Sequence, residues 1–291
     1  MLPTEVLRQV RRIEITTSRL VNELMAGRYE STFKGRGIEF DEVREYQAGD
    51  EIRLIDWNVT ARTGRPHVKR FIEERELTIM VLVDLSRSMA FGSVGSMKQR
   101  LAAELCAVLA FSAIRNHDLV GAMLCTDRIE RFIPPEKGSR HVLRLVRDVL
   151  SFEPSGHGTD LVGALHDLGR MIRRRSVVFL ISDFFTPDLR VPLAVANRRH
   201  DVIAVHLIDP RESTWPAVGR VRVEDAETGR AEVIPTGRAA ARDAVGAWAR
   251  DHQARVETMC RSAGVDVMPI RTDQSYIDPL LRFFNVRAAR R

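Results

Sequence analysis

The feature that most constrains the fold is the unbroken apolar run at residues 77–84, LTIMVLVD, which ends on a carboxylate. Strands that are covered on both faces of a parallel sheet have such continuous runs, whereas half-exposed strands alternate. Similar runs occur at residues 118–127, 176–183, 201–209 and 265–272, and segments with helical spacing of apolar residues separate them. Strands that alternate with helices predict an α/β domain with a doubly wound, mostly parallel sheet flanked by helices.

The chain before this domain has a different character. Apolar residues at helical spacing predict an amphipathic helix over residues 4–26. Residues 38–77 are charge-dense and predict short strands and turns. We therefore expect an N-terminal part, residues 1–75, with one helix and a small β-rich segment, and an α/β domain over residues 76–291. Alternation on both sides of a Thr-Gly turn predicts a β-hairpin inserted in that domain near residues 213–236.

Composition excludes several classes of protein. With 44% hydrophobic and 29% charged residues, the chain is typical of a soluble globular protein. No apolar run approaches the roughly 20 residues that span a bilayer, and the N-terminus has no apolar signal-peptide core. The three cysteines lie far apart without metal-ligand spacing, which favours buried reduced thiols. We therefore expect a cytoplasmic protein without a membrane span.

The charge balance raises nucleic-acid binding as a further hypothesis. The net charge is +6, and the densest basic clusters are residues 170–176 and the C-terminal VRAARR. Neither cluster interleaves the aromatic residues on which a single-strand-binding surface stacks bases. A solvated surface accounts for these arginines, so no nucleic-acid partner is expected.

Oxygen-bearing side chains lie where strands end or helices begin. Asp84 ends the first apolar run, with Ser86 and Ser88 at alternate positions after it. Asp183 ends a later run in the same way, and Thr159 lies just before a helix. In parallel sheets, ligands bind beyond the carboxyl ends of the strands, at the switch in strand order. We therefore expect these side chains at one site.

The donor types predict the metal. Hydroxyl and carboxylate oxygens without His or Cys suit a hard cation, so the predicted ion is Mg²⁺, with Mn²⁺ as an alternative. Structural alternatives exist for each residue. Ser86 and Ser88 are candidates for capping the next helix, Thr159 for capping the helix from Asp160, and Asp183 for a plain loop acid. One metal site accounts for all of them together, whereas these alternatives account for them one by one.

The pattern Asp84-x-Ser86-x-Ser88, with Thr159 and Asp183, resembles the metal-ion-dependent adhesion site of von Willebrand factor A domains. The resemblance covers roughly residues 76–275, and the order of the elements agrees. It implies a bound Mg²⁺ whose coordination is completed by an acidic residue of a partner protein.

A second resemblance involves residues 35–76, which are similar to the defining stretch of the DUF58 family of bacterial and archaeal von Willebrand A-like proteins. The matching features are Glu39-Phe40, Arg44-Glu45-Tyr46, Gly49-Asp50, Arg53, Ile55-Asp56-Trp57, Ala61-Arg62 and Glu74. The chain is similar to the short members of the family, which lack N-terminal transmembrane helices. The resemblance implies association with MoxR-type AAA+ ATPases, and it implies no reaction.

These features predict a Mg²⁺-dependent protein-interaction module, an adaptor or co-chaperone of a MoxR-type AAA+ ATPase, and not an enzyme. The alternative is a Mg²⁺-dependent phosphohydrolase that uses Asp84 as nucleophile. Phosphohydrolases of that design use a second aspartate, two residues later, as general acid. Ser86 occupies that place, and its hydroxyl has no suitable pKa for the role. The sequence also contains no P-loop and no GxGxxG after a strand, which disfavours nucleotide hydrolysis.

Apolar side chains in the surrounding loops predict the contact surface for the partner. Met89, Phe91, Phe184 and Phe185 are the candidates, arranged around a charged centre as in an anchor region. The alternative for Phe184 and Phe185 is a place in the core. His157 lies in a neighbouring loop, and we expect it to be an exposed residue rather than a ligand.

Overall fold

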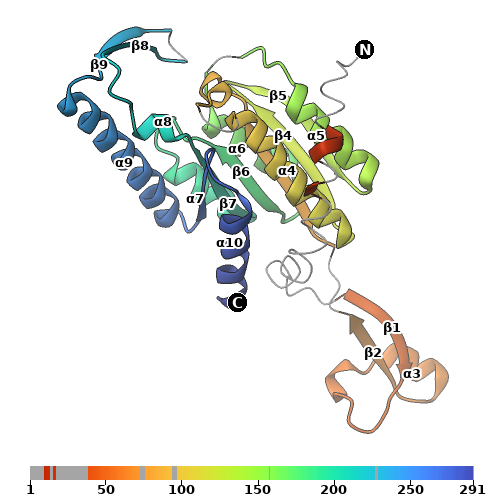
Figure 1. Cartoon of the computed structure of the whole chain (residues 1–291). Helices are drawn as coiled ribbons and strands as arrows, with labels where there is room; N and C mark the ends of the chain where they lie inside the picture. The colour runs from red at the N-terminus through yellow and green to blue at the C-terminus, as the bar shows by residue number, and fades with distance from the viewer. Residues whose placement is uncertain are drawn as a thin grey trace. The chain divides into compact units, whose positions relative to one another are not determined.

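The computed structural model describes residues 10–13, 16–17, 39–72, 76–93, 97–156, 158–226 and 229–290. The chain divides into two compact units, of which residues 33–77 form the smaller (Figure 1). The α/β domain from residue 78 onward belongs to the larger unit. Residues 10–13 and 16–17 are helical, and the rest of the helix predicted over residues 4–26 lies outside the described residues.

A six-stranded sheet forms the centre of the larger unit. Its strands are β3 (Thr78–Asp84), β4 (Leu119–Cys125), β5 (Ile129–Glu136), β6 (Val177–Ser182), β7 (Asp201–Ile208) and β10 (Asp266–Arg271). The strand order is β10-β7-β6-β3-β4-β5, and only the β4–β5 pair is antiparallel. The predicted doubly wound, mostly parallel sheet is therefore confirmed.

Helices cover both faces of this sheet. The long ones are α4 (Lys98–Arg115), α5 (Ser139–Ser151), α6 (Leu161–Met171), α7 (Arg190–Arg199), α9 (Ala239–Ser262) and α10 (Ile277–Ala289). Helix α4 packs beside α5, whereas α7 contacts both α6 and α9 (Figure 1). Met80 and Leu82 of β3 are buried in one cluster with Leu165 of α6 and Leu193 of α7. Of the helices in the described part of the chain, none is both long and apolar enough to cross a membrane.

The topology fixes where a ligand site can form. Strand β3 is buried along its whole length, as its unbroken apolar sequence predicts. The chain leaves β3 for β4 on one side and later enters β6 on the other side of β3. The switch in strand order therefore lies between the carboxyl ends of β3 and β6. Asp84 is the last residue of β3, and Asp183 directly follows β6.

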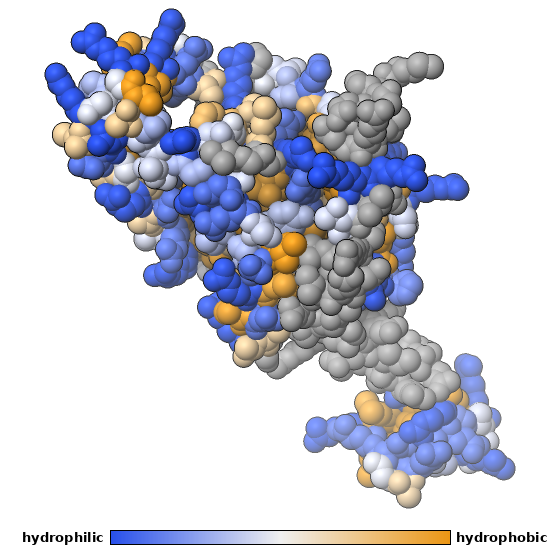
Figure 2. Space-filling model, in the orientation of Figure 1, coloured by the Kyte–Doolittle hydropathy of each residue, from blue (hydrophilic) through white to orange (hydrophobic). Residues whose placement is uncertain are grey.

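A hairpin interrupts the α/β pattern within the predicted range. Strands β8 (Arg220–Glu224) and β9 (Ala231–Pro235) pair antiparallel. The short helix α8 (Pro210–Ser213) precedes them, and the side chain of Asp209 caps it. Figure 2 shows hydrophobic side chains at the hairpin within a largely hydrophilic face, and Val233 of β9 is 57% exposed.

The smaller unit is more regular than the short strands and turns that its sequence predicts. Its elements are β1 (Glu39–Glu45), the 3₁₀ helix η2 (Ile52–Leu54), α3 (Trp57–Thr63) and β2 (His67–Ile72). Strands β1 and β2 pair antiparallel. The carboxylate of Asp56 starts α3 by accepting the N–H groups of Asn58 (2.9 Å) and Val59 (3.2 Å). Arg44 makes a bidentate pair with Asp50, at 2.7 and 2.8 Å.

Candidate metal centre

Asp84 is the most buried acid at the switch point. Its side chain is 0% exposed at the end of β3, in parallel register with Cys125 of β4. The Ser86 N–H donates to Asp84 Oδ1 (2.8 Å), and the Ser182 hydroxyl donates to Oδ2 (2.6 Å). Both donors are neutral. Within the described part of the chain, no Lys, Arg or His forms an ion pair with this carboxylate.

The two serines after Asp84 turn their hydroxyls toward each other. Ser86 precedes the 3₁₀ helix η3 (Arg87–Ala90), yet its side chain makes no capping hydrogen bond. Instead, its Oγ lies 3.1 Å from Ser88 Oγ. Ser86 is 1% exposed, and Ser88 is half-buried. The capping alternative therefore does not describe Ser86, and the hydroxyl pair remains as a set of oxygen donors.

Asp183 brings a second buried carboxylate to the same edge of the sheet. It is 1% exposed and follows β6, the parallel neighbour of β3. Burial, together with the negative charge of Asp183, raises the pKa of Asp84 to about 6. Two buried acids therefore lie close enough to oppose each other's ionisation, which is the electrostatic condition that a cation relieves.

A lysine that the sequence did not indicate compensates one of the two acids. Lys98, in the first turn of α4, is 0% exposed, and its Nζ lies 2.8 Å from Asp183 Oδ2. It also forms an ion pair with Glu212. Burial lowers the pKa of Lys98, but these two carboxylates outweigh burial and raise it, so the ammonium stays charged. No sequence signal finds it, because a lysine at a helix start usually faces solvent and is disfavoured by the helix dipole.

Thr159 lies close to the end of β4. The Asp160 N–H donates to the carbonyl of Thr126 (2.8 Å), and Thr126 directly follows Cys125, the register partner of Asp84. The chain at Thr159 is thereby tied to the carboxyl end of the strand beside β3. Asp160 is the residue whose side chain caps α6, so Thr159 is not its N-cap.

Glu130 of β5 anchors the loop before Thr159. Its carboxylate accepts the N–H of Gly156 (2.6 Å) and the hydroxyl of Ser155 (2.9 Å). A Cβ on Gly156 would collide with the side chains of Thr126 and Asp127, so the loop needs glycine at this close approach. The predicted exposure of His157 lies outside the described residues.

The donor set fits a small hard cation. A buried carboxylate without an ionic partner is costly, and Asp84 is such a group. The Ser86 N–H and the Ser182 hydroxyl that donate to it are neutral, so they leave the charge of this carboxylate uncompensated. The described residues hold no cluster of three or more His, Cys, Asp and Glu. The candidate donors are hydroxyl and carboxylate oxygens. A cavity of about 230 Å³, lined in part by Ser86, Met89 and Gly156, lies beside them.

The structure corrects half of the predicted contact surface. Met89 is 0% exposed and Phe184 is 2% exposed, so neither side chain is available to a partner. Met89 is the buried residue of η3, and Phe184 belongs to the core cluster of α6, α7 and α9. Phe91 is 44% exposed, and Phe185 is half-buried, so these two remain candidates.

An exposed tryptophan that sequence reasoning missed extends the candidate surface. Phe185 stacks on His252 of α9, with ring centroids 4.4 Å apart, and on Trp248, at 5.6 Å. Trp248 is 49% exposed, and its ring lies within 10° of the plane of His252. His252 Nε2 lies 3.0 Å from the carbonyl of Asp183, which ties this stack to the candidate centre. Helix α9 follows β6 only after many residues, so the sequence gives no sign that Trp248 and His252 stack on Phe185.

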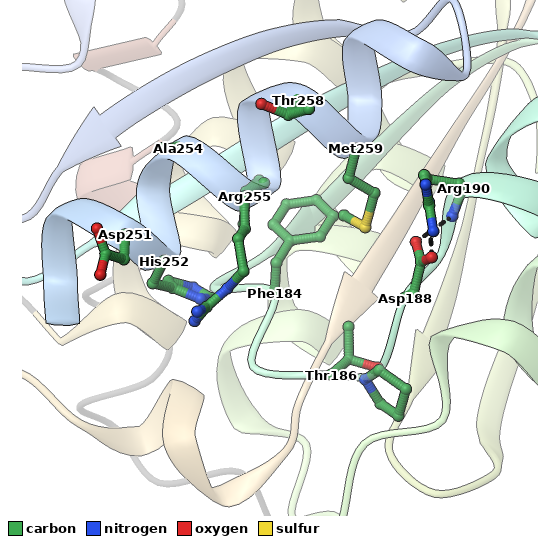
Figure 3. Close-up of a pocket in the computed structure, with 12 residues that line it drawn as sticks. Phe184, Thr186, Asp188, Arg190, Asp251, His252, Ala254, Arg255, Thr258 and Met259 are labelled. Carbon is green, nitrogen blue, oxygen red and sulfur yellow. Dashed lines mark hydrogen bonds and ion pairs between the residues drawn. The ribbon is translucent and has the colours of Figure 1, made fainter.

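A groove of about 820 Å³ lies beside the turn that follows β6 (Figure 3). Phe184 lies between the turn after β6 and the α9 side chains of His252 and Met259. Arg190 on the rim is paired with Asp188 at 2.6 Å. The lining contains two arginines and two aspartates, so the groove does not select ligands by net charge.

Comparison with known proteins identifies the family. Residues 42–255 match the family described as "Protein of unknown function DUF58". The chain belongs to the DUF58 family. This DUF58 protein is 33% identical over 277 residues to "Uncharacterized protein Rv1480" of Mycobacterium tuberculosis, which covers 94% of this chain and 87% of the relative. "Uncharacterized protein Mb1516" of Mycobacterium bovis matches with the same values.

A solved structure supports the fold, and a second one is similar to this chain. An aerotolerance-related membrane protein from Bacteroides fragilis superposes with a TM-score of 0.52 at 15% identity, over 74% of this DUF58 chain and 100% of that chain. A von Willebrand factor type A protein from Catenulispora acidiphila matches with a TM-score of 0.38 at 10% identity, over 76% and 43% of the two chains. The larger unit has a von Willebrand factor A-like fold, and the resemblance to DUF58 and to this fold is confirmed.

Proposed function

We propose that this DUF58 protein is a Mg²⁺-dependent protein-interaction module. Asp84, Ser86, Ser88, Thr159 and Asp183 are the candidate metal ligands. The observation that carries the proposal is the fully buried carboxylate of Asp84, which neighbours a second acid and pairs with no cation in the described chain. Mg²⁺ or Mn²⁺ would supply the missing positive charge through the oxygen ligands that such ions prefer.

The partner in this proposal contributes an acidic side chain. A divalent ion held largely by neutral hydroxyls keeps an attraction for one more carboxylate, and charge-assisted contacts of this kind are stronger than neutral ones. One such contact gives little affinity, so neighbouring apolar side chains must add to it. Phe91, Phe185 and Trp248 are exposed or half-buried and supply that area. The family resemblance makes a MoxR-type AAA+ ATPase the proposed partner, with this chain as its adaptor or co-chaperone.

The proposal includes no catalysis by this chain. Ser86 stands two residues after Asp84, where a phosphohydrolase of the alternative design needs a carboxylic acid. Its hydroxyl lies 3.1 Å from the Ser88 hydroxyl, which is a neutral group like itself. Phosphatase, nuclease and ATPase assays should therefore read at background. Metal-dependent turnover that disappears in Asp84→Ala would make the chain an enzyme.

Metal binding is tested by titration calorimetry with Mg²⁺ and Mn²⁺. The wild type should bind one ion, and Asp84→Ala and Asp183→Ala should lose most of the affinity because each removes a buried charge. Asp243→Ala, at an exposed position of α9, is the matched control and should bind as the wild type does. Equal binding by wild type and Asp84→Ala would remove the basis of the proposal.

Partner binding is tested by capture of a purified MoxR-type ATPase in Mg²⁺ and in EDTA. Capture should require the metal and should fall in Ser88→Ala and Thr159→Ala. Trp248→Ala should weaken capture without changing metal affinity, whereas Val233→Ala, at the exposed hairpin, should change neither. Unchanged capture in EDTA would place the interface away from the metal centre.

A further inference from the structure

We propose that Lys98 is a positioning residue that makes the centre select Mg²⁺ over Ca²⁺, by holding one carboxylate oxygen of Asp183. The inference rests on the proposed metal site and concerns its ion specificity. Neither the metal-ligand pattern nor the family assigns a role to this lysine. The structure places it in direct contact with one of the two acids at the switch point.

The ammonium of Lys98 has little freedom to move. Its side chain is 0% exposed, and it donates to Asp183 Oδ2 (2.8 Å) and to Glu212 Oε1. The ring of Phe185 closes a third side, with its centroid 5.2 Å from Nζ. A buried ammonium is stable only when such partners replace the water it has lost. If Lys98 moved away from Asp183, its charge would be buried with less compensation, so the contact is held in place.

The second partner of Lys98 is itself fixed. Glu212 Oε2 accepts the N–H of Asp209 (2.9 Å), and the two residues form the capping box of α8. Asp209 is 0% exposed and accepts hydrogen bonds from the Ser93 N–H (2.9 Å) and the Thr272 hydroxyl (2.8 Å). Lys98 is therefore attached to a hydrogen-bonded network at the start of α8, and it holds Asp183 from that side.

This contact determines what Asp183 can offer an ion. The Lys98 ammonium holds Oδ2, so an ion bound through both oxygens would have to compete with this ion pair, whereas among the described residues Oδ1 accepts the Phe185 N–H at a long 3.4 Å. Asp183 can therefore act through a single oxygen. Mg²⁺ accepts single-oxygen ligands and water in octahedral order at about 2.1 Å, whereas Ca²⁺ takes about six to eight oxygens and gains from bidentate carboxylates. An Asp183 restricted to one oxygen favours the smaller ion.

A purely structural ion pair would behave differently. Its loss would lower stability, and it would weaken Mg²⁺ and Ca²⁺ binding to a similar extent. The ratio of the two dissociation constants therefore separates a positioning role from a structural one.

The decisive variant is Lys98→Met/Glu212→Gln. It removes one positive and one negative charge, so the net charge is unchanged and no buried acid loses its counter-ion except Asp183. Glu212→Gln alone is the matched control, because Lys98 remains on Asp183. Calorimetry with Mg²⁺ alone and with Ca²⁺ alone gives the two dissociation constants for each protein, and urea denaturation in chelator shows that each is folded.

We expect the wild type to bind Mg²⁺ more tightly than Ca²⁺. The double variant should shift the ratio toward Ca²⁺ by about tenfold or more, the size typical for loss of a group that orients a metal ligand. Glu212→Gln should keep the wild-type ratio, because Lys98 remains on Asp183. A folded double variant with the wild-type ratio, an equal shift in Glu212→Gln, or a wild type that prefers Ca²⁺ would each overturn the role of Lys98 and leave the metal site standing. A wild type that binds neither ion would overturn the metal site as well.

Discussion

Replacing Asp84 by asparagine should stabilise the metal-free protein at neutral pH, although the change removes a candidate metal ligand. Burial and the nearby charge of Asp183 raise the pKa of the Asp84 carboxyl from 3.8 to about 6. A carboxyl with a higher pKa in the folded state favours folding when protonated and opposes it when ionised. The contribution of Asp84 to stability is therefore fully present below about 3.8 and is lost as the pH rises through about 6.

The pKa difference sets the magnitude. From 3.8 to about 6, at about 1.4 kcal/mol per pKa unit, ionisation of Asp84 costs the folded state about 3 kcal/mol above about pH 7. At about pH 5 the cost is about half as large, because the unfolded chain is ionised there while the folded protein is mostly protonated. Asparagine has nearly the same shape, keeps an oxygen for the Ser86 N–H and carries no charge. The variant should therefore avoid most of this cost.

The assay is urea denaturation in chelator at about pH 5 and about pH 7.5. Asp84→Asn should exceed the wild type in free energy of unfolding by about 1.5 kcal/mol at the lower pH and by about 3 kcal/mol at the higher. Asp243→Asn, at an exposed position, is the control and should show no such trend. The reasoning is refuted if Asp84→Asn is less stable than the wild type at about pH 7.5, or if its advantage does not grow with pH.

Two further substitutions test the surroundings of the centre. Lys98→Met should lower the free energy of unfolding in chelator by about 3–5 kcal/mol, because Asp183 and Glu212 lose a buried counter-ion. Arg100→Met, on an exposed part of the same helix, should cost under about 1 kcal/mol in the same urea experiment. Gly156→Ala should weaken Mg²⁺ binding about tenfold in calorimetry, because a Cβ there displaces the loop that leads to a candidate ligand. Unchanged affinity would show that this loop does not contribute to the centre.

Much of the fold was predictable because burial on two faces leaves a plain signal. Strands β3, β6 and β7 are almost entirely buried, and their sequences contain no alternation that would permit another reading. Helix α3 was missed for the opposite reason. It has only seven residues and no buried face, and it depends on the capping carboxylate of Asp56 rather than on apolar periodicity. In a charge-dense segment of this kind, a search for apolar residues at helical spacing does not detect the helix.

The candidate centre was predictable where it depended on strand ends. Asp84 and Asp183 meet because β3 and β6 are parallel neighbours, and the rule for switch points requires no further information. The sequence left open a core position for Phe184 and Phe185, but it did not show which of the two is buried. Its backbone has a positive φ of 58°, which few aromatic residues adopt, and the Ser182 hydroxyl accepts its N–H at 2.8 Å. This turn directs Phe184 into the core and leaves Phe185 half-buried, so two adjacent phenylalanines differ in their exposure to solvent.

The negative charges of the two buried acids are compensated in different ways. Lys98 forms an ion pair with Asp183 and shares its charge with Glu212, whereas Asp84 is left for an exchangeable ion in the proposed centre. Binding at about 100 times the dissociation constant stabilises a native state by about 2.7 kcal/mol. That gain is about equal to the 3 kcal/mol that ionised Asp84 costs at neutral pH, estimated from its pKa of about 6. Mg²⁺ at about 100 times its dissociation constant would therefore restore most of the stability that this acid removes, and it should bring the wild type nearly level with Asp84→Asn, which cannot make the same gain.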